Sequence, residues 1–325
     1  MNTPPISLDS LAIEKTTLAW LKALKAMNLP PVSQTPVDQL RAGLEANQAR
    51  LKDKPKALSD DLDIPAGPGG KVSVRLLRPS GVPGKRPIVV YLHGGGWVNG
   101  SPDTHDRFAR DIVNASGAAM AVVHYSRSPE VRHPAALEEC YAVTAWLAEN
   151  GGALGLDESR IALLGDSSGG NLAAAVALLA HRRGGPAIRH QTLIYPVVDA
   201  SCSTPSYEMY AEGLNLTRDA MRWYWEQYAP DEAARAGGTA SVLHAPKEDL
   251  AGMPSTLLVT AEFDVLRDEG EAFAAKLLKA GVAVTATRYL GTVHAFASNN
   301  ALANTPATRA LVAQVGNAIR EAFRI

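Results

Sequence analysis

Short apolar runs rich in β-branched residues recur from about residue 57 to the C-terminus, and segments with helical patterns separate them. This alternation is typical of βαβ units and of a mostly parallel sheet. Several runs are apolar at almost every position, as strands must be when helices cover both faces of a sheet. Seven runs therefore predict strands, at residues 72–79, 87–94, 118–125, 160–167, 191–198, 256–264 and 284–290.

Helical patterns fill three of the intervals between these strands. Residues 134–150, 171–183 and 269–281 have the apolar periodicity of amphipathic or buried helices, and Gly281 marks the end of the last one. The predicted fold class is therefore α/β, with a mostly parallel central sheet flanked by helices. For a chain of 325 residues we expect one large sheet-centred domain with an accessory element.

Two segments do not follow this alternation. Residues 1–55 have a helical pattern, with Leu18, Leu21 and Leu24 at three-residue spacing, and residues 200–238 contain no predicted strand. Open α/β sheets bind ligands at the carboxyl ends of their strands. We therefore predict that the two segments form a helical cap over those ends. Residues 56–199 and 239–325 then form the main domain. Plain surface helices are the alternative.

The second of these segments carries a cluster of aromatic side chains. Met221, Trp225 and Tyr228 fall at helical spacing and share one face, while Trp223 lies on another. Such a stripe more often packs a cap against a core than binds a ligand. The alternative is a pocket wall, in which case Trp223 and Trp225 are candidate substrate contacts.

Composition narrows the choice of partners. There are 32 Lys and Arg against 33 Asp and Glu, and a net charge of −1 gives no reason to expect nucleic acid. No stretch approaches the ~18 apolar residues of a membrane span, and the N-terminus lacks the basic and apolar regions of a leader. Cys140 and Cys202 have no metal-ligand spacing and are expected to be unpaired thiols. We expect a cytoplasmic protein without a membrane partner, and a homodimer stays open as an alternative.

A serine between two glycines ends the predicted strand at 160–167. The motif GDSSG at residues 165–169 has the form Gly-X-Ser-X-Gly and opens the predicted helix at 171–183. A strand–turn–helix of this form exposes the serine oxygen in a strained backbone conformation, which makes Ser167 a candidate nucleophile. The helix N-terminus behind it favours developing negative charge. The alternative is a Gly/Ser-rich loop without chemistry.

A run of three glycines follows the predicted strand at 87–94, in the motif HGGGW at residues 93–97. Glycines allow a turn whose backbone N–H groups point into open space, where they can receive an oxyanion. The expected donors are the amides of Gly95, Gly96 and Ser168, and of Ser168 only the backbone is needed. A flexible loop or a phosphate-binding loop is the alternative, but no lysine follows the glycines as in a P-loop. Trp97 is a further candidate substrate contact.

A serine nucleophile on this kind of sheet is followed along the chain by an acid and then by a histidine. Asp264 ends the predicted strand at 256–264, and His294 follows the strand at 284–290, so both lie at the same sheet edge as Ser167. The other seven histidines precede Ser167 or do not follow a strand. We expect His93 to brace the glycine turn. The rest are expected to be surface or core residues: His105, His124, His133, His181, His190 and His244.

Three other acids lie close to Asp264. Asp268 and Glu269 begin the following helix and are expected to cap it or to offset its dipole. Glu262 shares a face of the strand with Asp264. Asp264 is preferred because its position matches the template of a Ser-His-Asp triad.

The motifs HGGGW, GDSSGG, FDVLRDEG and VHAF, in this order, resemble the hormone-sensitive-lipase-like family of bacterial esterases. The similarity runs from about residue 57 to the C-terminus, and the two remaining helical segments sit where that family keeps its cap. The resemblance implies an α/β-hydrolase fold and hydrolysis of carboxylic esters with short to medium acyl chains. It also implies that no cofactor or metal is required and that the cap shapes the acyl pocket.

The chain departs from the family pattern at two places. Ser168 stands where the family usually has alanine, and residues 125–130 read YSRSPE where the family tends to read YRLAPE. Three other functions stay open: an amide hydrolase such as an aryl formamidase, a non-catalytic ligand receptor of the same fold, and a lipase activated at interfaces. A receptor of this kind would lack the base histidine, and no exposed apolar lid indicates the lipase.

Overall fold

A single twisted sheet forms the centre of the computed structural model, which describes residues 7–51, 53–82 and 84–325. Its eight strands follow the order β1-β2-β4-β3-β5-β6-β7-β8, and all neighbours are parallel except β1–β2 and β2–β4. The predicted fold class is confirmed. The strands are β1 (Leu58–Ile64), β2 (Val72–Arg78), β3 (Arg86–Leu92), β4 (Ala119–His124), β5 (Leu156–Asp166), β6 (His190–Ile194), β7 (Ser255–Phe263) and β8 (Val284–Val293).

The strand β1 was missed by the sequence analysis. Its residues LSDDLDI carry three aspartates, and most of its positions are exposed at the edge of the sheet, so neither an apolar run nor a regular alternation marks it. Pairing with β2 forms it, together with side-chain bonds such as that between Arg75 and Asp61, whose Nε to Oδ1 distance is 2.8 Å.

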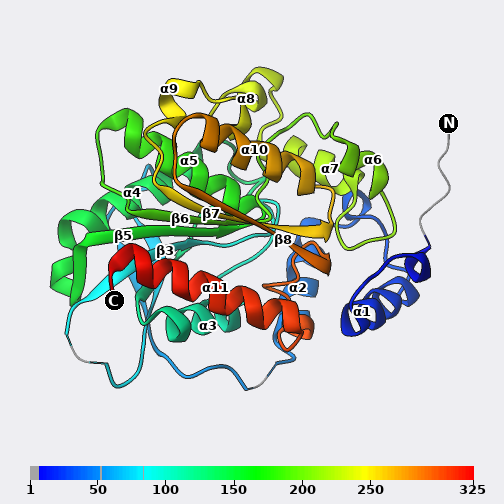
Figure 1. Cartoon of the computed structure of the whole chain (residues 1–325), viewed down its shortest axis with the longest axis horizontal. Coiled ribbons are helices and arrows are strands. Elements are labelled where there is room, and N and C mark those ends of the chain that lie inside the picture. Colours follow the sequence, from blue (N-terminus) through cyan, green and yellow to red (C-terminus); the bar gives the residue numbers. More distant parts are fainter. Residues whose placement is uncertain (1–6, 52, 83) are drawn as a thin grey trace.

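Helices cover both faces of the sheet (Figure 1). On one face lie α3 (Asp106–Ser116) and α11 (Pro306–Phe323), and on the other lie α4 (Ala135–Asn150), α5 (Ser168–Arg183) and α10 (Arg267–Lys279). The predicted helices correspond to α4, α5 and α10, whereas α3 and α11 were not singled out. Short elements complete the chain: α9 (Lys247–Leu250) and the 3-10 helices at Leu8–Ser10, Val32–Gln34, Gly151–Leu154, Val242–His244 and Asn300–Leu302.

Alternate residues of β3 face the two helical layers. Ile88, Val90 and Leu92 join one cluster of buried hydrophobic side chains, and Val89 and Tyr91 join the other. Successive side chains of a strand point to opposite faces, so a strand between two layers must be apolar at every position. This explains the continuous apolar runs in the sequence.

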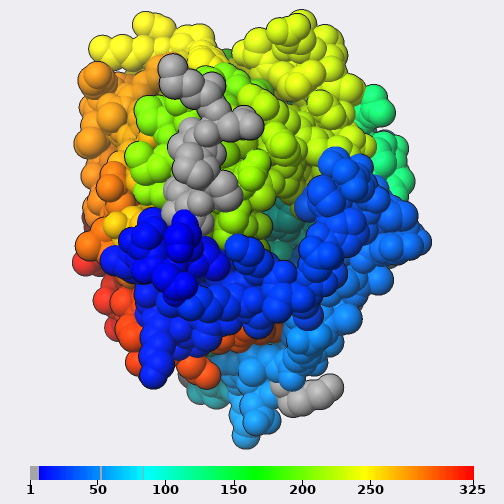
Figure 2. Space-filling model, turned by 90° about the vertical axis from the view of Figure 1, so that its right-hand side faces the viewer, coloured from blue at the N-terminus to red at the C-terminus, as the bar shows by residue number. Residues whose placement is uncertain are grey.

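The two segments predicted as a cap lie on one side of the molecule, at one end of the sheet. They contain α1 (Lys15–Ala26) and α2 (Val37–Gln48) in the first segment, and α6 (Pro205–Met209), α7 (Arg218–Tyr228) and α8 (Glu232–Ala236) in the second. Figure 2 shows the first segment in blue beside the second in yellow-green on the same face. Residues 1–6 and 52 of the predicted cap lie outside the described residues. The division into two domains stays a prediction.

Long polar side chains attach α2 to the loops at the end of the sheet. Arg41 donates from Nε to the carbonyl of Val98 at 2.8 Å, and its guanidinium binds both carboxylate oxygens of Glu130. Hydrogen bonds from Arg41 lower the pKa of Glu130 to about 2. Gln48 is buried and donates to the carbonyls of Thr104 and Ser298 at 2.8 and 2.9 Å. The helix is thus held by directional contacts as well as by apolar packing.

The first residue of β6 gives a testable dependence of stability on pH. Burial lowers the pKa of His190 to about 4, whereas an unfolded histidine titrates near ~6.5. As pH falls below ~6.5 the unfolded chain binds the proton and the folded chain does not, so stability is lost toward pH 4. Relative to His190→Gln, the wild-type free energy of unfolding should fall by about 2 kcal/mol from pH 7 to pH 5, measured by denaturant melts. A difference between the two proteins that does not change with pH would contradict this.

Candidate active site

Ser167 sits in a sharp turn between β5 and α5. Its backbone has φ 57° and ψ −123°, a conformation with positive φ that is strained for a residue other than glycine. The turn is so tight that a Cβ at Gly165 would overlap the carbonyl of Gly169, and one at Gly169 would overlap that of Leu92. Any side chain at residue 165 or 169 would therefore collide with the backbone, which is why glycines stand on both sides of Ser167.

Ser167, His294 and Asp264 form one line of hydrogen bonds. His294 follows β8, and its Nε2 lies 2.9 Å from Ser167 Oγ, while its Nδ1 lies 2.7 Å from Asp264 Oδ2. All three side chains are buried. The second oxygen of Asp264 accepts from the Leu266 amide at 3.0 Å, which fixes the carboxylate. Such a line can hold the histidine in the tautomer whose Nδ1–H donates to the carboxylate. Nε2 is then free to accept the serine proton.

The rival acids have other partners. Glu262 accepts from the Gly291 amide at 2.7 Å, and Asp268 accepts from the Ser206 amide at 2.8 Å. Glu269 lies in the first turn of α10 as predicted, but it is fully buried and accepts from the Val198 amide at 2.7 Å. Burial raises the pKa of Glu269 well above its usual value. Among these acids the histidine contact belongs to Asp264.

The glycine turn at residues 93–97 runs beside the serine. Gly95 and Gly96 have φ of 125° and 62°, in the range that favours glycine. Within the described part of the chain, neither of their amides donates to a protein acceptor. Gly94 donates to Asp166 Oδ1 at 2.9 Å, which ties this turn to the one that carries Ser167. The arrangement leaves two amides next to Ser167 available for a developing oxyanion.

His93 braces this turn from inside, as predicted. Its Nδ1 lies 2.9 Å from the carbonyl of Gly94, and its ring stacks on Tyr125 with centroids 4.4 Å apart. Burial holds the pKa of His93 well below its usual value, and the neighbouring His105 adds to this.

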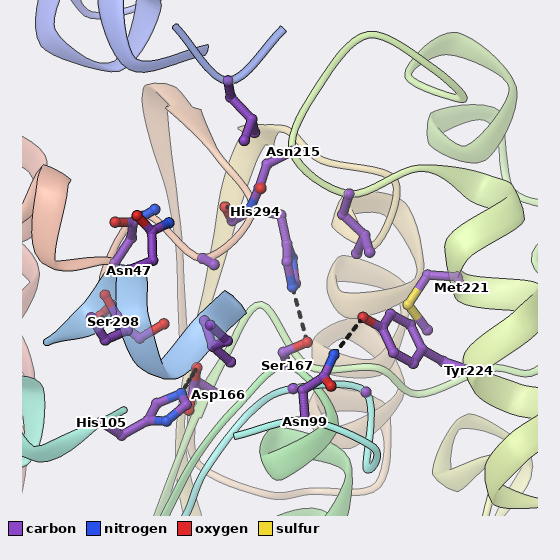
Figure 3. A pocket seen from close by; sticks show the side chains of 18 of the residues that line it. Asn47, Asn99, His105, Asp166, Ser167, Asn215, Met221, Tyr224, His294 and Ser298 are labelled. Atoms are coloured by element: carbon purple, nitrogen blue, oxygen red, sulfur yellow. Dashed lines mark hydrogen bonds and ion pairs between the residues drawn. The ribbon is translucent and has the colours of Figure 1, made fainter. Parts of the chain in front are cut away.

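Ser167 and His294 line a cavity of about 250 Å³ (Figure 3). Residues from the sheet edge and from both predicted cap segments line it. On one side of the serine lie Met221 and Tyr224 of α7, and on the other side lie Asn47 and Ser298. The other lining residues are Trp20, Leu24, Leu44, Gln48, Gly95, Gly96, Asn99, His105, Asp166, Asn215, Leu216, Ala295 and Asn299.

Comparison with known proteins shows the family to which this chain belongs. A family profile described as alpha/beta hydrolase fold matches residues 89–298, which is more than half of the chain. The chain is an α/β-hydrolase. Its sequence places it in the hormone-sensitive-lipase-like family, so the resemblance seen in the motifs is confirmed.

Relatives of this α/β-hydrolase include named esterases. Carboxylesterase NlhH of Mycobacterium tuberculosis is 37% identical over 274 residues, which cover 82% of this chain and 85% of that protein. Ethyl acetate hydrolase of Pseudomonas putida is 36% identical, with coverages of 82% and 85%. The crystal structure of a thermostable esterase from Pseudomonas putida is 41% identical, covers all of both chains, and superposes with a TM-score of 0.94.

The three tryptophans named as candidate substrate contacts of this α/β-hydrolase are not among the residues that line the cavity, and the pocket-wall interpretation stays a prediction. Trp97 is fully buried and stacks on Tyr228, with centroids 4.2 Å apart and planes 2° from parallel. Trp225 is also fully buried, 4.7 Å from the Trp97 ring, and Trp223 packs edge-on against Tyr224 at 5.2 Å. Trp225 and Tyr228 of the stripe join α7 to the glycine turn, which agrees with the favoured packing interpretation, while Met221 lines the cavity.

Two cavity residues that the sequence analysis missed join α7 to the glycine turn. Asn99 Nδ2 donates to the Tyr224 hydroxyl at 3.1 Å, and the Tyr224 ring covers Gly96 so closely that a Cβ there would overlap it. Burial raises the pKa of Tyr224 to about 12, so the hydroxyl keeps its proton. The two side chains are 125 residues apart, and no spacing rule could have paired them.

Asp166 and His105 are also cavity residues with roles that the motifs did not indicate. The Tyr91 hydroxyl donates to Asp166 Oδ1 at 2.8 Å, and His105 Nε2 lies 3.6 Å from Asp166 Oδ2. Burial opposes ionisation of Asp166, but His105 and these hydrogen bonds outweigh it and lower the pKa. His105, predicted to be a surface or core residue, is buried in the cavity wall.

Three further observations concern metal ligands, long apolar helices and the cysteines. Among the described residues, no group of three or more His, Cys, Asp or Glu is arranged to hold a metal ion. Over the same residues, none of the helices is both long enough and apolar enough to span a bilayer. Cys140 and Cys202 are buried and unpaired, as predicted, and burial raises the pKa of Cys202 to about 12.

Proposed function

We propose that this α/β-hydrolase cleaves carboxylic esters with short to medium acyl chains, with Ser167 as nucleophile, His294 as general base and Asp264 as the group that orients the histidine. The observation that carries the proposal is the Asp264–His294–Ser167 line of hydrogen bonds beside the free amides of Gly95 and Gly96. The esterases among the relatives support the substrate class.

In the proposed mechanism, Ser167 Oγ attacks the ester carbonyl while His294 Nε2 takes its proton. The tetrahedral oxyanion receives hydrogen bonds from the amides of Gly95, Gly96 and Ser168. The Ser168 amide is suited to this because the first N–H groups of a helix have no partner within the helix, and Ser168 begins α5. The imidazolium then protonates the leaving alcohol, and the acyl group stays on Ser167.

Water completes the proposed cycle. His294 removes a proton from water as the water oxygen adds to the acyl carbonyl, and the same amides stabilise the second oxyanion. The bond between the acyl carbon and Ser167 Oγ then breaks, Ser167 takes the proton from His294, and the acid leaves. None of these steps needs a metal or a cofactor, and a receptor without turnover would not need His294 held in line with Ser167.

Turnover of matched substrates by the purified protein tests the proposal. We expect hydrolysis of 4-nitrophenyl acetate and butyrate with kcat/KM well above that for an aryl formamide, and weaker hydrolysis of the laurate. Faster cleavage of the formamide would replace the ester proposal with an amide hydrolase. Binding of the esters without release of nitrophenol would indicate a receptor.

The proposed chain length rests on a second cavity. A cavity of about 300 Å³ lies beside the first, and Trp20, Leu24, Asn47 and Asn299 line both. Its other walls include the apolar side chains of Ala23, Met27 and Leu51. Apolar walls favour an alkyl chain over a polar group. We propose that acyl chains too long for the first cavity extend into the second, between α1 and α2.

Filling this second cavity should shorten the accepted chain. Ala23 lines the second cavity but not the first, so Ala23→Trp should leave kcat/KM for 4-nitrophenyl acetate within about twofold and lower it for the decanoate about tenfold, or about 1.4 kcal/mol. Ala42→Trp is the matched control, because Ala42 lies on α2 and lines neither cavity. An unchanged ranking of chain lengths in Ala23→Trp would contradict the role of this cavity.

A further inference from the structure

The hydroxyl of Ser168 has a partner that its place in the motif did not predict. The side chain is fully buried, and its Oγ accepts a hydrogen bond from the backbone N–H of Trp97 at 3.2 Å. Trp97 ends the glycine turn of residues 93–97. The side chain of residue 168 therefore contacts the turn that holds the proposed oxyanion donors, while its own amide is the third proposed donor.

Tyr125 holds the other end of that turn. Its buried hydroxyl donates to the carbonyl of His93 at 2.7 Å. Ser168 therefore holds the turn at Trp97, and Tyr125 holds it at His93. Gly95 and Gly96 lie between these two attachment points.

The turn needs such support because of its backbone conformation. Gly95, Gly96 and Trp97 have φ of 125°, 62° and 59° in succession. A tryptophan at positive φ is strained, and such a conformation persists only when surrounding contacts fix it. The Trp97 ring is held by its stack on Tyr228, and its backbone N–H is held by Ser168. Removal of the acceptor would leave a buried N–H unpaired next to the oxyanion donors.

We propose that the Ser168 hydroxyl is a positioning group that holds the 93–97 turn so that the Gly95 and Gly96 amides meet the transition state. This rests on the proposed function, and it assigns to Ser168 a role for its side chain in addition to its amide. The hydroxyl itself has no contact with the reacting atoms. Its loss should therefore weaken binding of the oxyanion and leave binding of the uncharged substrate unchanged.

Ser168→Ala tests the proposal against a matched control. Ser116→Ala removes another buried hydroxyl that accepts from a backbone N–H, that of Ala118, also at 3.2 Å. For Ser168→Ala we expect kcat to fall about tenfold with KM within twofold, and by the same factor for acetate, butyrate and octanoate esters, because every acyl group passes through the same oxyanion. Ser116→Ala should leave kcat unchanged.

A second readout isolates the oxyanion. An alkyl trifluoromethyl ketone forms a hemiketal oxyanion with Ser167, so its affinity should fall by the same tenfold in Ser168→Ala, while the affinity of the product carboxylic acid stays constant. Unchanged kcat, a loss that varies with acyl length, or equal weakening of both inhibitors would overturn the proposal. A wild-type protein that hydrolyses no ester would instead contradict the proposed esterase function. Failure of the Ser168 proposal is therefore distinguishable from failure of the proposed function.

If Ser168→Ala does not fold, Tyr125→Phe provides a second test of whether contacts at the ends of the 93–97 turn support catalysis. This change removes only the hydroxyl that donates to the His93 carbonyl and leaves the ring stacked on His93. It should lower kcat and trifluoromethyl ketone affinity together, with KM unchanged. Wild-type kcat in Tyr125→Phe would count against a turn that is held from both ends.

Discussion

Ser167→Ala is expected to remove nearly all ester turnover, with kcat falling on the order of 10⁶-fold by analogy with the serine of a protease triad. The alanine variant has no oxygen to form the acyl-enzyme, so only direct attack by water remains, helped by the amides of Gly95 and Gly96. Release of nitrophenol from 4-nitrophenyl butyrate measures the loss. The melting temperature should stay close to that of the wild type, because the change removes a single side-chain oxygen.

The neighbouring serine provides the control for this result. Ser168→Ala is expected to lose about tenfold in kcat, which is far less than Ser167→Ala. Equal losses in the two variants would mean that the nucleophile had been assigned to the wrong position of the turn. A protein that keeps wild-type activity after Ser167→Ala would have another nucleophile altogether.

Asp264→Asn is expected to lower kcat on the order of 10⁴-fold, which is the effect of this substitution in the protease triad. The side-chain amide of this variant would present an NH₂ or a carbonyl to Nδ1 of His294. The NH₂ would favour the tautomer whose Nε2 carries a proton and cannot accept one from Ser167. Binding of substrate does not involve Asp264, so KM should change little. Initial rates with 4-nitrophenyl butyrate measure the effect.

Glu262→Gln is the matched comparison for the acid. Glu262 lies two residues before Asp264 and its carboxylate accepts from the Gly291 amide, which an amide oxygen can still do. We therefore expect kcat close to that of the wild type. A large loss in Glu262→Gln with a mild effect of Asp264→Asn would transfer the orienting role to Glu262.

Apolar runs predicted the sheet because its strands lie between two helical layers. β3 contributes side chains to both buried clusters, so nearly every position had to be apolar. β1 was missed for the opposite reason, because its edge position lets three aspartates face solvent. An edge strand forms because its backbone pairs with the neighbouring strand. Backbone pairing places few demands on the side chains, so the sequence of an edge strand does not indicate it.

The proposed catalytic residues could be read from motifs because each ends a strand, and the carboxyl ends of parallel strands meet at one edge. The cavity walls could not be read in this way. The candidate substrate contacts Trp97 and Trp225 are buried against Tyr228 and do not line this cavity. Met221 and Tyr224 of the same helix line it, and only the orientation of α7 distinguishes them from Trp225.

The packing of α7 on the glycine turn limits how this protein could be recombined with its relatives. The Tyr224 ring covers Gly96, and Trp97 is enclosed by Trp225 and Tyr228. A chimaera that receives α7 from another esterase without the matching turn would bring mismatched side chains against the oxyanion donors. In contrast, α1 contributes Trp20 and Leu24 to the cavity wall, whereas its Thr17 and Leu21 are buried. Libraries that aim at new substrates should therefore vary Trp20 and Leu24 and keep α7 together with residues 93–97.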